Sequence, residues 1–399
     1  MTDNTKIINE LWEIINERET SADPNSYTYK ILQEGIKRAS QKLGEEASEL
    51  IIASLAEQGK SLPTYTMGFE NSSSYYEERP AAKRLSDYFG MKHSSLEINS
   101  NQLLKIVPEV FNASDEPFAD SSALPFFALS KEVSKNITVA LSGDGGDEVF
   151  GGYRKYIGEK WSNLGNKIPF VIRNFLISIL VENKDTKLGE ISRRLRRFLY
   201  NSSSDDISRH IKWLEQIDEE EVFSLLGHNT SSTRKLFIDS RKGIEDKINA
   251  ILLGDLNISL SGDMLVKLDR MSMANSLEVR SPFLDRALVE YAFSIACNLK
   301  VGNITGKKIL REAFVHRLPK WSINLPKKGF EIPIANWLQK DLNNMLNHVC
   351  LKNNLDKIGI KNYAMVNEWK NTLTRGKLDT SWELWTLMSY YFWSEPQDL

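Results

Sequence analysis

One stretch near the middle of the chain constrains the fold more than any other. It reads LSGDGGDEVFGGY, from Leu141 to Tyr153, and it follows an apolar, β-branched run that begins at Ile137. Such a run predicts a buried strand. The glycines predict a turn whose backbone a ligand can approach closely, because no Cβ stands in the way. Ligands of open α/β sheets bind at this carboxyl edge. If the motif were shorter, the preferred interpretation would be a glycine-rich turn whose acidic side chains are simply solvated.

The segment before this stretch alternates between strand and helix patterns. Strands are predicted at residues 63–69, 94–98 and 137–141, and helices at residues 77–89, 107–111 and 124–133. Strands that alternate with helices predict a parallel sheet. Beyond residue 156 the pattern is mostly helical, and the apolar run from Trp382 to Phe392 predicts a core helix.

Composition and charge exclude several classes of protein. The net charge of −2 argues against a nucleic-acid partner. The apolar residues 170–181 are too few to span a bilayer and are interrupted by Arg173, so no membrane association is predicted. The N-terminus is polar and has no signal-peptide core. Two isolated cysteines, Cys297 and Cys350, are typical of a reducing cytoplasm, where we expect the protein.

Several motifs together resemble those of the asparagine synthetase domain, from about Ser54 to the C-terminus. They are the stretch described above with its continuation to Tyr156, DRMSMA at 269–274, SLEVRSPFLD at 276–285, KKILRE at 307–312 and PKKGF at 326–330. The resemblance implies an α/β fold with a Rossmann-like parallel sheet of the PP-loop ATPase (adenine nucleotide alpha hydrolase) type. It implies an α/β core over residues 54–156 and a mostly helical part over residues 157–399, which returns to the site around residues 260–330.

The resemblance also implies an activity. Enzymes of this type join aspartate to ammonia with ATP and Mg²⁺, through β-aspartyl-AMP, and release asparagine, AMP and pyrophosphate. The residues implied to contact ATP are Met67, Ser142 and Gly143, and the implied catalytic residues are Asp144, Asp147 and Lys307. The ammonia would come from solution or from a separate glutaminase chain.

Each implied catalytic residue has a distinct role in this resemblance. Asp144 is the implied base for ammonia. Asp147, with Glu148 beside it, would bind the substrate aspartate at its amino group. Lys307 would stabilise charge on the phosphate and the acyl group, as a mobile point charge can, with Lys308 as the neighbouring alternative.

The N-terminal segment has a different character. Residues 7–18 and 31–51 have helical periodicity, and Glu45, Glu46 and Glu49 can converge on one helix face. Such a face could contribute to a Mg²⁺ site, although a solvated face is the simpler interpretation. Residues 1–53 resemble the opening half of phosphoribosyl-ATP pyrophosphohydrolase, through LWEII, SYT and KLGEEASE. The later metal-binding helix of that family has no counterpart here, so we expect no competent metal site.

The synthetase resemblance lacks one motif. The family's first strand is followed by a pyrophosphate-binding loop, Ser-Gly-Gly-x-Asp-Ser, where residues 41–49 read QKLGEEASE. Three functions therefore stay open. The first is an asparagine synthetase-type amide ligase impaired by loss of this loop. The second is a non-catalytic, nucleotide-binding scaffold remnant. The third is a phosphoribosyl-ATP pyrophosphohydrolase of histidine biosynthesis.

Overall fold

The computed structural model describes residues 62–70, 77–165, 168–180, 187–201, 205–228, 233–323, 325, 332–375 and 379–395. They belong to two compact units. The larger unit covers Pro63–Gly306 and Pro326–Leu399, and the described part of the smaller unit is Leu62 with Lys307–Leu325. The helices predicted within residues 1–53 lie outside the described residues, as do Glu45, Glu46 and Glu49.

The larger unit opens with the predicted strand, helix and strand. β1 (Thr64–Phe69) and β2 (His93–Ile98) lie parallel, in register from Thr64↔His93 to Phe69↔Ile98. A parallel pair needs a crossover connection, and α4 (Arg79–Tyr88) provides it. Pro80 stands in the first turn of α4, where the missing N–H has no helical partner to lose.

A second strand pair carries the glycine-rich stretch. β3 (Val139–Leu141) lies parallel to β4 (Glu278–Arg280), with Ala140 opposite Val279. The prediction of a buried strand is wrong, because Val139 is 43% exposed and Leu141 is 51% exposed. Among the described strands, β3 pairs only with β4. A two-stranded sheet offers little surface for helices to pack against, so side chains of β3 stay exposed.

The predicted fold class is confirmed in its coarse form, as a mixed α/β protein with many helices and parallel strands. The described strands form two separate pairs, β1–β2 and β3–β4. A single Rossmann-like sheet of the PP-loop ATPase type stays a prediction.

The rest of the larger unit is mostly helical, as predicted beyond residue 156. Ahead of β3 lie α5 (Ser100–Asn112) and α6 (Ala123–Val133). The helices between β3 and β4 are α7 (Gly146–Phe150), α8 (Arg154–Gly165), α9 (Phe170–Ile179), α10 (Lys187–Asn201), α11 (Asp206–Leu214), α12 (Glu219–Leu226), α13 (Thr233–Ser240), α14 (Lys247–Asp255), η1 (Leu256–Met264) and α15 (Leu265–Met273). After β4 come η2 (Pro282–Leu284), α16 (Arg286–Ser294), α17 (Cys297–Lys300), α20 (Ile334–Gln339), α21 (Asn343–Val349), α22 (Lys352–Lys357), α23 (Tyr363–Arg375) and α24 (Ser381–Ser394).

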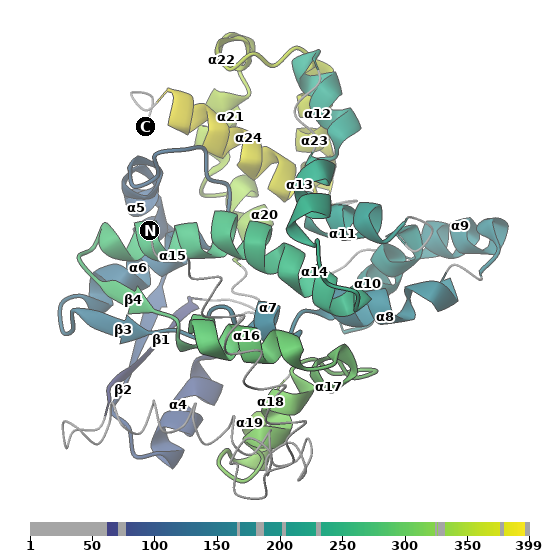
Figure 1. Cartoon of the computed structure of the whole chain (residues 1–399). Coiled ribbons are helices and arrows are strands. Elements are labelled where there is room, and N and C mark those ends of the chain that lie inside the picture. The colour runs from purple at the N-terminus through teal and green to yellow at the C-terminus, as the bar shows by residue number, and fades with distance from the viewer. Residues whose placement is uncertain are drawn as a thin grey trace, which may run out of the picture. The chain divides into compact units, whose positions relative to one another are not determined.

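One long helical run leads to β4. α14, η1 and α15 follow one another without a break from Lys247 to Met273, and Figure 1 shows them as a continuous helix. The middle part, η1, is π-helical, a form that is rare and often found at functional sites. Four residues separate the end of this run from Glu278, so the run leads directly into the strand that pairs with β3.

The main hydrophobic core surrounds α24, which packs against α5, α20, α21 and α23. Trp385 and Phe392 of α24 are buried and lie 5.8 and 5.9 Å from the ring of Phe111. These contacts confirm the predicted C-terminal core helix, since its aromatic residues pack within the core.

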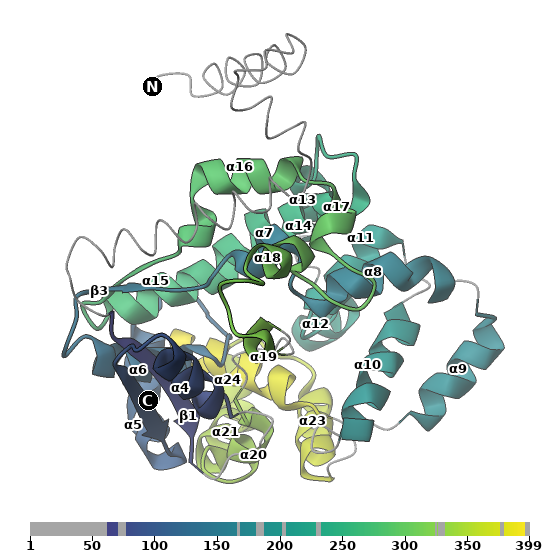
Figure 2. The same cartoon turned by 90° about the horizontal axis from the view of Figure 1, so that it is seen from below.

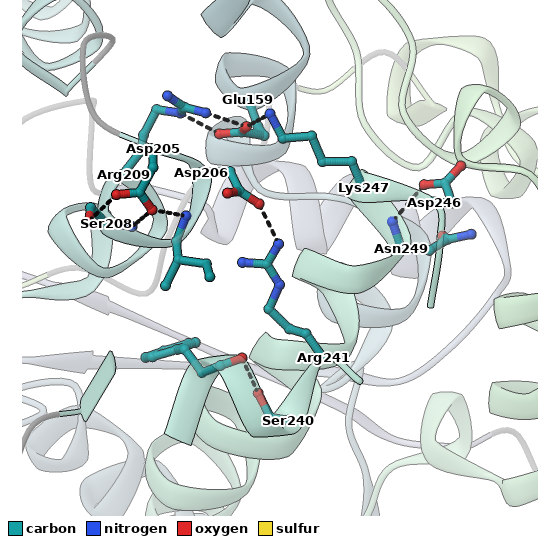
Figure 3. Close-up of polar contacts among 12 residues, drawn as sticks. Glu159, Asp205, Asp206, Ser208, Arg209, Ser240, Arg241, Asp246, Lys247 and Asn249 are labelled. Atoms are coloured by element: carbon teal, nitrogen blue, oxygen red, sulfur yellow. Dashed lines mark hydrogen bonds and ion pairs between the residues drawn. The ribbon is translucent and has the colours of Figure 1, made fainter. Parts of the chain in front are cut away.

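A buried ion pair joins α8 to α11. The Glu159 carboxylate accepts hydrogen bonds from Nε and Nη2 of Arg209, both at 2.6 Å, and Lys247 Nζ lies 2.6 Å from Oε1 (Figure 3). The side chains of Glu159 and Arg209 are 0% and 3% exposed. Burial favours the neutral acid, but the hydrogen bonds and charges of Arg209 and Lys247 hold the pKa of Glu159 below its usual value.

Helix α9 is apolar on an exposed surface. Phe170 and Val171 are 66% and 77% exposed, and Figure 2 shows α9 beside α10 at one edge of the larger unit. Its 10 residues are fewer than a bilayer requires. Among the described helices, none is long and apolar enough to cross a membrane. Cys297 and Cys350 are free thiols, as predicted.

The described part of the smaller unit contains two short helices. α18 (Lys308–Ala313) begins directly after Lys307, and α19 (Lys320–Ile323) follows. Lys307 has a left-handed backbone with φ of 53°, uncommon for a residue with a Cβ. Its carbonyl accepts the hydrogen bond of Arg311 N at 2.9 Å, so the first turn of α18 starts from this residue.

Candidate active site

Two distant motifs meet where β3 and β4 end (Figure 1). Ser142 N donates to the Arg280 carbonyl at 2.9 Å, which continues the strand pairing beyond Leu141. The hydroxyl of Ser142 then lies 3.0 Å from the hydroxyl of Ser281. Residues 139 positions apart in the chain therefore adjoin at the carboxyl ends of two parallel strands, the edge at which ligands bind in α/β sheets.

Gly145 and Gly143 differ in the structural reason for having no side chain. Gly145 has a φ of +83°, and a Cβ on it would stand 2.2 Å from Cδ2 of Leu284. A Cβ on Gly143 would meet no atom within 4 Å. Gly145 is therefore required by the turn and its packing, whereas Gly143 leaves an exposed stretch of backbone beside Ser142 that a ligand can approach.

We predict that Gly145→Ala lowers the free energy of unfolding by about 1–3 kcal/mol, because the left-handed backbone and Leu284 both oppose a methyl group. Gly143→Ala is the matched control, and we expect it to change stability by less than about 0.5 kcal/mol. Chemical denaturation of the two variants measures both values. Equal losses would contradict this assignment.

The two predicted acids of the loop are only partly buried, whereas the next residue is buried. Asp144 and Asp147 are half-buried on and directly after the loop. Glu148 is 3% exposed, and its Oε1 accepts a hydrogen bond from the Tyr153 hydroxyl at 2.7 Å. Burial raises the pKa of Glu148, and this hydrogen bond opposes the rise. Glu148 is thus engaged with Tyr153, and its role as a substrate contact stays a prediction.

The loop itself contains three predicted site residues, Ser142, Gly143 and Asp144, and Asp147 follows in the first turn of α7. Met67 lies in β1, in the other strand pair, and its side chain is 5% exposed. Lys307 belongs to the smaller unit. One pocket that joins Met67 and Lys307 to the loop stays a prediction.

A second group of charged residues was missed by the sequence analysis. Lys267 of α15 donates to Asp120 Oδ2 at 2.7 Å and to Ser122 Oγ at 2.8 Å. Burial raises the pKa of Asp120, but the charge and hydrogen bond of Lys267 outweigh it, so the pKa is low. Asp263, one turn before Lys267, has a pKa raised to about 6 by burial and by the charge of Asp120. The only available signal was the i, i+4 spacing of Asp263 and Lys267.

We predict that Asp263→Asn stabilises the fold by about 1–3 kcal/mol above pH 7, and by much less near pH 4. An acid whose folded pKa is raised from 3.8 to about 6 binds its proton more tightly in the folded state. The wild-type carboxylate therefore costs stability as the pH rises through this window, and asparagine avoids the cost. Urea denaturation at the two pH values measures the difference, and an equal effect at both would contradict the prediction.

Metal-binding groups are scarce in the part of the chain that the structure describes. It contains no group of three or more His, Cys, Asp or Glu side chains arranged to hold a metal ion. The Glu77 carboxylate accepts hydrogen bonds from Nε of Arg79, at 2.9 Å to Oε1 and 3.1 Å to Oε2. The weak metal candidates Glu45, Glu46 and Glu49 fall outside these residues.

Comparison with known proteins agrees with the motifs that meet at β3 and β4. The family model for asparagine synthase matches residues 48–395. Asparagine synthetase [glutamine-hydrolyzing] 1 of Bacillus subtilis is 29% identical over 352 residues, which cover 87% of this chain and 54% of that protein. A putative glutamine-hydrolyzing asparagine synthetase of Mycobacterium bovis is 28% identical over 83% of this chain and 50% of its own length.

A third relative matches a shorter part. A putative glutamine-hydrolyzing asparagine synthetase of Methanocaldococcus jannaschii is 31% identical over 213 residues, which cover 53% of this chain and 40% of that protein. The chain thus spans about half the length of the curated relatives that match most of it. Because the family model covers most of the chain and includes every motif at the paired strand ends, this protein belongs to the asparagine synthase family.

Proposed function

We propose that this chain is an ATP-dependent amide ligase of the asparagine synthetase type, with turnover limited by its triphosphate side. In the first step, an oxygen of the aspartate side-chain carboxylate attacks the α-phosphorus of ATP. The bond from that phosphorus to pyrophosphate breaks, and β-aspartyl-AMP forms. In the second step, ammonia attacks the acyl carbon, a proton leaves the nitrogen, and the bond to AMP breaks to give asparagine.

The observation that carries this proposal is the contact between Ser142 and Ser281. It joins the glycine-rich motif to the second family motif at one ligand-binding sheet edge. Beside it, the open side of Gly143 leaves space for the nucleotide phosphate or the acyl group. Both features suit a reaction in which two substrates must be held close together.

Asp147 and Asp144 have different roles in the two proposed steps. Asp147 binds the ammonium group of substrate aspartate and is needed for both steps. Asp144 accepts the proton from ammonia and is needed for the second step alone. General bases of this kind typically contribute about 10²–10⁴-fold to rate.

Charge on the phosphates and the acyl oxygen also has to be stabilised. Lys307 is the proposed cation for this purpose. Mg²⁺, when bound, would neutralise charge on the triphosphate. Phosphate oxygens of ATP and water molecules are ligands that Mg²⁺ prefers, so ATP itself would supply part of its coordination.

The triphosphate side limits the proposed rate. Backbone N–H groups and an Asp of the pyrophosphate-binding loop would ordinarily contact the β- and γ-phosphates. Residues 41–49 read QKLGEEASE at that place. We therefore propose that the site binds substrate aspartate well but stabilises the leaving pyrophosphate poorly.

The source of ammonia is a further proposal. The relatives from Bacillus subtilis and Mycobacterium bovis are named as glutamine-hydrolyzing, and the match covers about half of each. We propose that a separate glutaminase activity, or free ammonia, supplies the amine for this chain.

Hydroxylamine trapping tests the proposed function. Hydroxylamine attacks an acyl adenylate without needing the ammonia site, so the chain should release AMP and β-aspartyl hydroxamate in equal amounts from ATP and aspartate. AMP formation should depend on aspartate. Binding of ATP without either product would instead support a non-catalytic nucleotide-binding protein.

A further inference from the structure

A cavity of about 330 Å³ lies between α10, α11 and α12, in a region for which no role is proposed above. Its size is at the lower end of the range for small-molecule sites, about 300–1,000 Å³. Its lining combines both signs of charge with aromatic rings, and the residues that matter here are Tyr200, Asn201, Lys212, Trp213, Glu215 and Glu221.

One lining carboxylate has no partner. Glu215 caps the C-terminus of α11 and is half-buried, and among the described residues its side chain makes no hydrogen bond or ion pair. Burial raises the pKa of Glu215, the negative charges of Glu219 and Asp218 raise it further, and the positive charge of Lys212 opposes the rise. A partly buried carboxylate in such surroundings gains from a cation.

The other acids of the lining are already engaged. Asp218 accepts the backbone N–H of Glu221 at 2.8 Å, and Glu221 accepts the N–H of Asp218 at 3.3 Å. This reciprocal pair caps α12 and holds both side chains in place. Glu215 is therefore the carboxylate that can receive a ligand.

A cation without an ionic partner stands near it. Lys212 is three residues before Glu215, and its Nζ lies over the Tyr200 ring, 5.8 Å from the centroid. Within the described part of the chain, Lys212 forms no ion pair, with Glu215 or with another acid. The cavity thus presents a positive and a negative group that attract each other but form no direct ion pair.

The remaining walls suit an organic ligand. Trp213 lines the cavity and would lie 3.3 Å from a Cβ on Gly158 of α8, so its ring is held by packing. Asn201 is 5% exposed, and its Oδ1 has no hydrogen-bond partner among the described residues. Aromatic faces beside an unsatisfied amide fit a small molecule with both apolar and polar parts.

We propose that this cavity binds a free amino acid. The ammonium group would pair with Glu215 and the carboxylate with Lys212, while the side chain packs against Tyr200 and Trp213. A zwitterion is the small ligand class that satisfies both separated charges at once. This site is distinct from the proposed aspartate site at Asp147 and does not depend on it.

Calorimetric titration of the full chain tests this proposal. The probes are the free amino acids, each compared with its N-acetyl derivative and its methyl ester. The protein carries Asp147→Asn throughout, so that the proposed synthetase site contributes little. We expect at least one free amino acid to bind, and both of its derivatives to bind about tenfold more weakly, because each lacks one charge.

Matched variants locate the binding. Glu215→Gln and Lys212→Met should each raise the Kd of that amino acid about tenfold. Glu220→Gln removes an exposed carboxylate outside the lining that does not act on Glu215, and it should leave the Kd unchanged. Unfolding temperatures confirm that the variants are folded. Absence of binding up to about 10 mM, or a Kd unchanged by both lining variants, would overturn the proposal.

Discussion

The purified chain, supplied with aspartate, ATP, Mg²⁺ and ammonium, is expected to form asparagine more than about 10²–10³-fold more slowly than the Bacillus subtilis relative under the same conditions. Loss of one preorganised hydrogen-bond donor from such a site typically costs that much in kcat. In the proposed function, a whole loop is replaced, because residues 41–49 read QKLGEEASE. Pyrophosphate leaves in the first step, so its charge must be stabilised in the transition state and not only on binding.

The control for this prediction is Asp147→Ala, which should abolish the residual asparagine formation because it removes the proposed partner of the substrate ammonium group. A rate comparable to that of the relative, lost in Asp147→Ala, would contradict the prediction. It would mean that another segment of the chain supplies the donors of the pyrophosphate-binding loop.

Glu159→Met is expected to lower the free energy of unfolding by about 3–5 kcal/mol. The substitution removes the carboxylate that Arg209 binds through two nitrogens at 2.6 Å, in a place where Arg209 is 3% exposed (Figure 3). Breaking a buried pair from one side leaves a charge out of water without its compensation. Urea denaturation at neutral pH measures the loss.

Two further variants separate charge from packing. Glu159→Met with Arg209→Leu should regain most of the lost stability, because no buried charge is left behind. Asp205→Asn removes an exposed pair with Arg234, whose side chains are 50% and 44% exposed, and should cost less than about 1 kcal/mol. A double variant as unstable as the single one would show that packing, not charge, determines the effect.

The local elements of the fold were predictable because local periodicity determines them. Strands near residues 63–69 and 94–98 and the helix between them were predicted within two residues of their observed ends. The C-terminal helix was predicted from its apolar run, and Trp385 packs in the core as expected. In each case the residues that decide the structure are neighbours in sequence.

Pairing between distant residues was not predictable in the same way. β4 has only three residues, Glu278–Arg280, and two of them are charged, so no strand pattern stands out. Its partner β3 lies 139 positions away in register, and a single sequence contains no signal for that distance. The hydrogen bond from Lys267 to Asp120 spans 147 positions and was missed for the same reason.

The same distinction between neighbouring and distant residues applies to the candidate site. The loop with Ser142, Gly143, Asp144 and Asp147 is one contiguous motif, so its members had to lie together once the turn formed. The exposure of Val139 and Leu141 was not predicted, because burial depends on what covers a strand and not on its own residues. Met67 and Lys307 come from other parts of the chain, and their approach to the loop stays a prediction.

Isotope exchange between pyrophosphate and ATP tests the central claim most directly, because it reports the first step alone. The chain should show slow exchange that depends on aspartate. Asp144→Asn should retain this exchange while losing asparagine formation, because the proposed role of Asp144 is only to accept the proton from ammonia. Asp147→Asn should lose both, because the proposed role of Asp147 is to bind the substrate of both steps. Exchange that is absent, independent of aspartate, or unchanged in Asp147→Asn would contradict the account.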